Sequence, residues 1–231
     1  MEFRRLFQII SIISSVLFSE DGPVYHVPIH GTIDMGLPHY IQRVVNEAEA
    51  NNASAIIFDI DTFGGRVDAA TQIKDIILDS KVTTIAFINK RAISAGALIS
   101  LSCDSIFMTP GASIGAATAV DLQGNKASEK VISYMREEMA STAEANNRSR
   151  EIATSMVDED LSIPYLLNLE GDTLTSKDVE GFSEGKLITL STQLAVQLGI
   201  SDKEIETYDD LLAHLNFADA ETFEITETWS E

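Results

Sequence analysis

The chain has 231 residues, of which 45% are hydrophobic, with 13 Gly and 5 Pro. This composition suits one globular domain with short appendages, and it excludes collagen-like, low-complexity and wholly disordered chains. The single cysteine, Cys103, excludes an internal disulfide framework and a cysteine-based zinc site. A formal charge of −20 leaves no basic footprint for nucleic acid, so we expect a solvated acidic surface and no nucleic-acid partner.

The N-terminal segment has the basic, apolar, polar order that is typical of a secretory signal. Arg4 and Arg5 precede an apolar run over residues 6–18, which is shorter than the about 20 residues of a spanning helix. Leu17 is large for a residue near a cleavage site, so an uncleaved anchor and a buried first element stay open as alternatives. We expect residues 1–19 to be a signal peptide or N-terminal anchor, and the protein to be extracytoplasmic, membrane-associated or secreted.

Strand-like and helix-like patterns alternate from residue 24 onward. Continuous apolar or β-branched runs predict strands over residues 24–33, 55–61, 83–88, 105–109 and 185–190. Apolar residues at helical spacing predict helices that begin at Pro38 and after a glycine turn at 62–65, and further helices over 94–102, 129–146, 192–198 and 208–215. Strands separated by helices predict an α/β fold with a largely parallel sheet over residues 20–216. The acidic residues 217–231 are predicted to be a tail or linker.

A serine stands between a predicted buried strand and a predicted helix. Ser94 has only small residues on its C-terminal side, in the order Ser94-Ala95-Gly96-Ala97, and these leave room for a substrate carbonyl. A helix that begins there directs backbone N–H groups and the positive end of its dipole at developing negative charge. An N-cap serine would produce the same pattern, so the motif alone leaves both interpretations open.

Two glycines follow the preceding predicted strand. Gly64 and Gly65 lie at its carboxyl end, where ligands of open α/β sheets bind. Backbone N–H groups of paired glycines approach a ligand without a Cβ clash, although a tight strand-to-helix turn would need the same residues. A third small-residue turn, residues 110–116, follows the strand predicted over 105–109.

Together these motifs resemble a known superfamily. The segments FDIDTFGGRVDAA (58–70), RAISAGALISLSCDSIFMTPGASIGAA (91–117) and GKLITLSTQLAVQLGI (185–200) are similar to those of ClpP/crotonase proteins, in particular the long-form NfeD-type membrane-associated serine peptidases related to signal peptide peptidase A. The resemblance covers residues 24–215. It implies a ClpP/crotonase-like spiral of ββα units, homo-oligomers and stomatin- or flotillin-like membrane partners. The sequence itself has no metal-ligand cluster, and we expect no metal and no cofactor.

The resemblance also implies roles for particular residues. Ser94 would be the nucleophile, Gly64 and Gly65 would form the oxyanion loop, and the N–H of Ala95 would be the second oxyanion donor. These peptidases use a lysine on a later helix as the general base. A desolvated lysine can accept the serine proton because burial lowers its pKa.

The sequence departs from this family at the base. Aligning AEANNR (143–148) with the family places Ala140 where peptidases carry lysine, and alanine accepts no proton. Arg136, one turn earlier, stays charged and is a poor base. Lys130 is our candidate base, although an ordinary solvated lysine would fit the pattern equally. Lys126 lies in the preceding loop.

A Ser–His–Asp arrangement has less support in the sequence. The one histidine after Ser94 is His214, in the last predicted helix. The other histidines, which we expect to be structural, are His26, His30 and His39. Asp59 and Asp61 alternate along one strand, and Asp61 would cap the glycine turn.

Three functions are compatible with the sequence. The first is a Ser–Lys endopeptidase near the membrane, acting on an apolar peptide or membrane-protein segment. The second is a non-catalytic peptide-binding or scaffold protein that keeps the fold and lacks the base. The third is a crotonase-type acyl-CoA enzyme, which the absence of a basic cluster for CoA phosphates disfavours.

Overall fold

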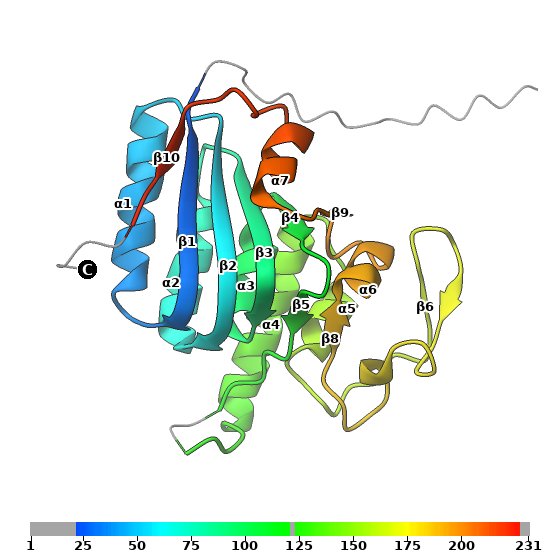
Figure 1. Cartoon of the computed structure of the whole chain (residues 1–231). Helices are drawn as coiled ribbons and strands as arrows, with labels where there is room; N and C mark the ends of the chain where they lie inside the picture. Colours follow the sequence, from blue (N-terminus) through cyan, green and yellow to red (C-terminus); the bar gives the residue numbers. More distant parts are fainter. Residues whose placement is uncertain (1–21, 121–122, 227–231) are drawn as a thin grey trace, which may run out of the picture.

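A computed structural model describes residues 22–120 and 123–226. The predicted N-terminal signal or anchor therefore lies outside the described residues. The described part is an α/β domain in which most helices cover one face of a parallel-rich sheet (Figure 1). Within it, no helix has the length and apolar character needed to cross a membrane.

The strands form one main sheet in the order β10-β1-β2-β3-β4-β9, all with parallel neighbours. Short β5 continues beside β3 and pairs antiparallel with β8. The bounds of these strands are β1 Val24–Ile33, β2 Ala55–Gly65, β3 Thr84–Ile93, β4 Ser105–Met108, β5 Ser113–Gly115, β8 Thr189–Ser191, β9 Lys203–Glu204 and β10 Thr222–Glu224. A separate hairpin consists of β6 Leu166–Leu167 and β7 Thr173–Leu174.

The predicted helices are present, together with a short α5 that the sequence pattern did not indicate, and their ends follow local chemistry. The helices are α1 Leu37–Ala50, α2 Val67–Leu78, α3 Ala95–Ser102, α4 Glu129–Ala145, α5 Arg150–Ser155, α6 Thr192–Gln197 and α7 Tyr208–His214, with a 3-10 turn at Glu180–Phe182. Pro38 lies in the first turn of α1, where its missing N–H costs no hydrogen bond. Gly199 follows α6 with a φ of 68°, in the left-handed conformation that glycine tolerates.

The central strand β2 is buried on both faces, as its continuous apolar sequence predicts. Phe58 and Ile60 belong to the large core between the sheet and the helices α1 to α4. Ile57 points to the other face, where it shares a smaller core with Leu211 and Leu215 at α7. The upper part of that second face is therefore covered by α7 (Figure 1).

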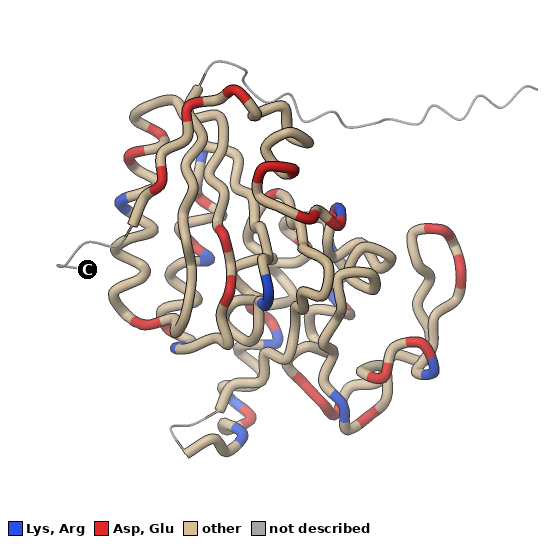
Figure 2. The backbone as a smooth tube through the Cα atoms, viewed as in Figure 1, with Lys and Arg blue, Asp and Glu red and all other residues tan. Residues whose placement is uncertain are grey.

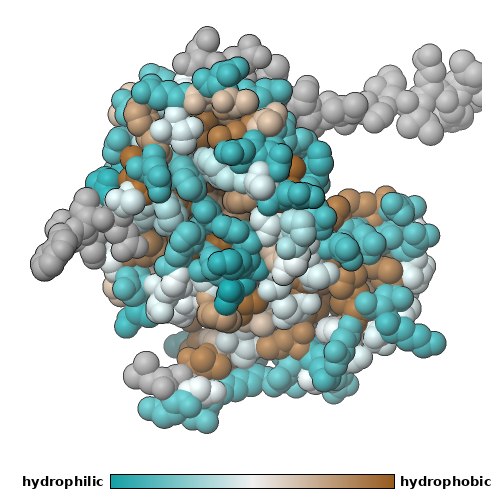
Figure 3. Space-filling view, viewed as in Figure 1, coloured by the Kyte–Doolittle hydropathy of each residue, from teal (hydrophilic) through white to brown (hydrophobic). Residues whose placement is uncertain are grey.

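The lower part of the same sheet face is polar and uncovered by helices. Acidic residues on β2 and basic residues near the end of β3 lie there, and the space-filling view shows a hydrophilic area over these strands (Figures 2 and 3). Asp61 contacts both Arg91, at 2.9 Å, and Lys90, at 3.6 Å. The acidic and basic groups partly neutralise one another on this face.

Two strands are longer than predicted. The turn predicted at residues 62–65 is the end of β2, and β3 continues to Ile93. The reason is pairing with a neighbour: Gly64 and Gly65 pair with Thr32 and Ile33 of β1, so the glycines stay in the sheet. A Cβ on Gly65 would lie 2.1 Å from the backbone oxygen of Ile33, which explains why glycine is needed there.

The prediction of a tail from residue 217 onward is wrong for the described part of that segment. Phe217 is buried at 3% exposure, and β10 adds to the edge of β1. The hydroxyl of Tyr40 donates to the backbone oxygen of Ile225 at 2.7 Å. The strand forms because an open edge offers backbone partners to a sequence with little periodicity of its own. Residues 227–231 lie outside the described residues.

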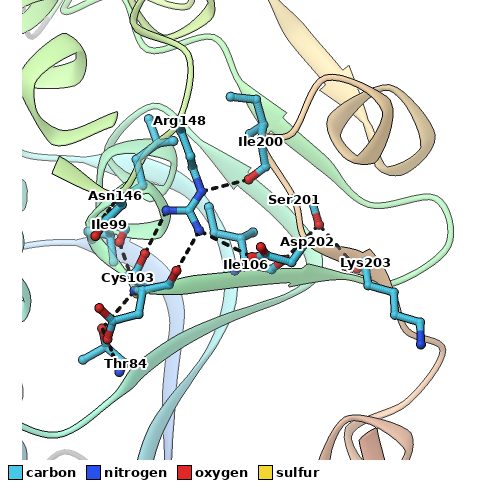
Figure 4. Close-up of polar contacts among 12 residues, drawn as sticks. Thr84, Ile99, Cys103, Ile106, Asn146, Arg148, Ile200, Ser201, Asp202 and Lys203 are labelled. Carbon is cyan, nitrogen blue, oxygen red and sulfur yellow. Dashed lines mark hydrogen bonds and ion pairs between the residues drawn. The ribbon is translucent and has the colours of Figure 1, made fainter. Parts of the chain in front are cut away.

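A buried arginine fixes the C-terminal end of α3. Arg148 donates to the backbone oxygens of Cys103, Asp104 and Ile200 at 3.0, 3.2 and 3.1 Å (Figure 4). Its guanidinium also lies 3.5 Å from the carboxylate of Asp202. These contacts join the helix that follows Ser94 to the loop before β9.

Candidate active site

Ser94 occupies the junction between β3 and α3 in a strained backbone conformation. Its φ of 56° and ψ of −118° are unusual for a residue with a Cβ. Ser94 is the N-cap residue of α3, but its side chain makes no capping hydrogen bond, so side-chain capping does not explain the serine. The backbone N–H donates to Gly115 at 3.0 Å, which fixes the residue while its hydroxyl is not used in a cap.

Gly64 lies directly against Ser94. A Cβ built on Gly64 would be 2.5 Å from the Cβ of Ser94 and 3.0 Å from its Oγ. The φ of Gly64 is +105°, which also favours glycine. Its N–H donates to the Thr62 hydroxyl at 2.9 Å, so this amide supports the loop rather than pointing at a ligand.

A small cavity opens beside Ser94 on the helix side of the sheet. Its volume is about 50 Å³. Gly65, from the glycine loop, and Ala95, the first residue of α3, both line it. The N–H at the start of a helix has no partner within the helix, so Ala95 can supply a donor. The remaining lining residues are Val67, Ala70, Ala117, Thr118, Ala119, Val120 and Met135.

A wider apolar groove adjoins this cavity. It has a volume of about 660 Å³ and shares Gly65, Val67 and Val120 with the cavity. Its other lining residues are Thr32, Ile33, Asp34, Arg66 and Asp68. The serine therefore lies where a narrow pocket meets an open groove large enough for an extended peptide.

No Lys, His, Asp or Glu is among the described residues that line the cavity. The candidate base Lys130 is exposed in the first turn of α4, and Ala140 is fully buried in the same helix. Arg136 contacts Asp158 and Glu129, and Lys126 lies 3.1 Å from Glu159. The structure thus brings together Ser94, Gly64, Gly65 and Ala95, and it does not bring Lys130 into the cavity lining.

The residue from α4 that does line the cavity is Met135. The sequence pattern marked it as one of several core methionines on an apolar helical stripe, and it is 3% exposed. Nothing in the spacing distinguished it from Met139, which is buried in the core. Its place beside the serine depends on how α4 packs against α3, which local sequence does not determine.

No histidine is among the described residues that line the cavity beside Ser94. His26 and His30 approach Asp59 at 3.5 and 3.4 Å on the sheet face that carries α7. Burial raises the pKa of Asp59, but the two facing imidazoles outweigh this effect, and the net pKa is lowered. His214 lies 3.3 Å from the ammonium of Lys203. Burial and that ammonium lower the pKa of His214.

Known proteins resemble this chain over most of its length. The family described as NfeD1b, N-terminal domain, matches residues 23–225. Membrane protein NfeD1b of Bacillus subtilis is 35% identical over 213 residues, which are 92% of this chain and 46% of that protein. Membrane-bound protease PH1510 of Pyrococcus horikoshii is 34% identical over 148 residues, 61% of this chain and 34% of that protein. The chain thus spans less than half the length of these relatives.

Solved structures share the fold. A serine-to-alanine variant of 1510-N, a membrane-bound stomatin-specific protease, superposes with a TM-score of 0.72 at 25% identity, covering 90% of this chain and 99% of that chain. A lysine-to-alanine variant of that protease, in complex with a substrate peptide, has a TM-score of 0.72 at 24% identity over 90% and 94% of the two chains. ClpP1 from Listeria monocytogenes has a TM-score of 0.56 at 24% identity over 80% and 94%. The fold is ClpP-like, and the chain belongs to the NfeD1b N-terminal domain family.

Proposed function

We propose that this chain is a serine endopeptidase domain that cleaves an apolar peptide near a membrane, with Ser94 as nucleophile. The observation that carries the proposal is the strained backbone of Ser94, held against Gly64 with its side chain free of a capping role. Strain of this kind persists at functional sites because it positions a group that a relaxed turn would not.

The chemistry follows from the residues around the serine. The Ser94 hydroxyl attacks the peptide carbonyl, and the carbonyl oxygen gains negative charge. The N–H of Ala95, at the positive end of α3, stabilises that charge, and the Gly65 backbone lies in the same cavity. The serine proton passes to a base, for which Lys130 is our sequence-based candidate. The base returns this proton to the leaving amine as the C–N bond breaks, and water then hydrolyses the acyl ester left on Ser94. Since Lys130 is exposed, this role requires its side chain to turn into the cavity.

Substrate and location are inferred from the groove and from the relatives. The groove beside Ser94 is lined in part by Ile33, Val67 and Val120, which suits an extended apolar segment. The relative 1510-N is a stomatin-specific protease, and we propose a stomatin-like membrane protein as the partner of this chain. We further propose an extracytoplasmic position through the N-terminal segment, which sequencing of the mature N-terminus after cell fractionation tests.

A second candidate function is peptide binding without hydrolysis. The described cavity lining lacks a titratable side chain, and Ala140 replaces the lysine that the family resemblance implies. In this case the groove and Ser94 would bind a membrane partner and support its assembly with this chain. This function predicts peptide binding that Ser94→Ala leaves unchanged.

Restoring a base separates the two functions. Ala140→Lys introduces the amine where the family resemblance places it, and Met135→Lys introduces it on a side chain that already lines the cavity. Burial there lowers the pKa of the amine and makes it a proton acceptor. Met135→Gln is the matched control, because it is polar and similar in length without being a base.

The experiment measures hydrolysis of apolar peptides by mass spectrometry for the wild type, Ser94→Ala and Lys130→Ala. Hydrolysis that Ser94→Ala abolishes supports the peptidase. An equal loss of hydrolysis with Lys130→Ala supports a catalytic dyad of Ser94 and Lys130, because removal of either member of one catalytic unit has about the same effect. Peptide binding without hydrolysis in the wild type, with activity gained by either lysine variant, supports the binding function.

We also propose that the domain self-associates, as the family resemblance implies. Size-exclusion chromatography with light scattering on the chain from residue 20 onward measures its mass. A mass above that of one chain supports the proposal, and a strict monomer at high micromolar concentration contradicts it.

A further inference from the structure

The cavity beside Ser94 is much smaller than the groove that leads to it. It has a volume of about 50 Å³, against about 660 Å³ for the adjoining groove. For comparison, an engineered apolar cavity of about 150 Å³ holds one benzene molecule. The space beside the serine therefore fits a group the size of a methyl or ethyl, and a leucine or phenylalanine side chain exceeds it.

The walls of the cavity come from several parts of the fold. Four of the ten described lining residues are alanines: Ala70 from α2, Ala95 from α3, and Ala117 and Ala119 from the segment after β5. Met135 reaches in from α4. These alanine and methionine side chains are buried, whereas Val120, at the mouth of the cavity, is exposed. Because buried walls are close-packed, a larger group can enter only at a cost in packing energy.

The polar groups of the cavity add to this restriction. The Thr118 hydroxyl donates to the backbone oxygen of Val157 at 2.6 Å, so it is already engaged. With no charged side chain among the described lining residues, the cavity offers nothing to hold a charged or strongly polar side chain. An apolar, small side chain is the group that fills it without an unpaired polar atom.

We propose that this cavity selects a small residue, Ala or Gly, at the position whose carbonyl lies over Ser94, and that Met135 sets the size limit. The inference rests on the proposed function and names its substrate class: an extended apolar segment with a small residue at the cleavage position. Truncating Met135 removes the one long side chain in the wall and enlarges the cavity toward the volume of a leucine side chain.

The test uses a series of acylated apolar peptides that differ at one residue, with Gly, Ala, Val, Leu or Phe at that position. Binding is measured by calorimetry with the Ser94→Ala protein, and hydrolysis is measured in parallel with the wild type. Met135→Ala is the test variant. Met139→Ala is the matched control, because Met139 is buried in the same helix and does not line the cavity.

We expect the Ala peptide to bind at least about 10-fold more tightly than the Leu and Phe peptides, since a misfit of a few methylenes in an apolar pocket has this order of effect. Met135→Ala should remove or reverse the preference for Ala over Leu, whereas Met139→Ala should keep it. Equal affinity across the series, or a preference that Met135→Ala leaves unchanged, overturns the inference while peptide binding itself stands. Failure of every peptide to bind or be cleaved instead overturns the proposed function, and the inference with it.

Discussion

Gly64 and Ser94 form a close pair across the end of the sheet, in which a Cβ on the glycine would lie 2.5 Å from the Cβ of the serine. The two residues come from the ends of neighbouring strands, β2 and β3, and each has a positive φ. We infer that this contact positions Ser94 at the cavity, and that it depends on the positive φ of both Gly64 and Ser94.

Gly64→Ala tests this contact, with Gly111→Ala as its control. Both glycines have a positive φ, but a Cβ on Gly111 meets nothing within 4 Å. We expect Gly111→Ala to lower the free energy of unfolding by about 1 to 2 kcal/mol from backbone strain alone. Gly64→Ala should cost about 2 kcal/mol more because the methyl group also overpacks the serine. Urea unfolding measures both, and equal losses would show that the close contact is unimportant.

Ser94→Gly and Ser94→Ala separate strain from chemistry. Both remove the hydroxyl, but only glycine removes the Cβ that makes a φ of 56° costly. We expect Ser94→Gly to be more stable than Ser94→Ala by about 1 kcal/mol, and both to lack hydrolysis. Thermal and urea unfolding give the comparison. A glycine variant that is less stable than the alanine variant would argue against stored strain at this residue.

Arg148→Met tests the anchor at the end of α3. The substitution leaves the three backbone oxygens that the guanidinium satisfies without their donor, at Cys103, Asp104 and Ile200. We expect a loss of at least about 3 kcal/mol in the free energy of unfolding. Arg150→Met, which removes surface ion pairs to Glu137 and Glu144, should have little effect. Similar stability of the two variants would contradict a structural role for Arg148.

The lowered pKa of Asp59 predicts a pH dependence of stability. Burial raises this pKa, and the facing His26 and His30 lower it further than burial raises it. A carboxylate whose pKa is lowered on folding stabilises the protein above its unfolded pKa, and the contribution is lost as pH falls through the folded value. Asp59→Asn should therefore be less stable than the wild type at about pH 5, where a carboxylate is charged and an ordinary imidazole is protonated, and the difference should shrink below the ordinary aspartate pKa. A difference that is constant down to strongly acidic pH would contradict the assignment.

The sequence allowed the alternation of strands and helices to be predicted because apolar periodicity and the proline and glycine signals are local. The central strand around Phe58, the helix begun by Pro38 and the junction at Ser94 all follow from such signals. What could not be predicted depends on partners elsewhere in the chain. The glycines at 64 and 65 stay in β2 because β1 pairs with them, and β10 forms because the edge of β1 is open.

In the candidate site too, some features follow from local sequence and others depend on packing with distant parts of the chain. Ser94 and Gly64 are adjacent in the structure because they lie at the carboxyl ends of β3 and β2, which are neighbouring parallel strands. The order of these strands in the sequence allows this adjacency to be expected. Met135 could not be singled out, because its helical spacing matches that of any core residue and its contact with the cavity depends on the packing of α4. Lys130 is a candidate by elimination along the sequence alone, and its side chain is exposed in the structure.

The most direct test of the proposed peptidase is the cleavage of an apolar peptide with a small residue at the cleavage position, followed by mass spectrometry. We expect the wild type to convert the peptide into two products, and Ser94→Ala, with the fold and peptide affinity intact, to produce neither. Formation of the same products at the same rate by Ser94→Ala would contradict the assignment of Ser94 as the nucleophile.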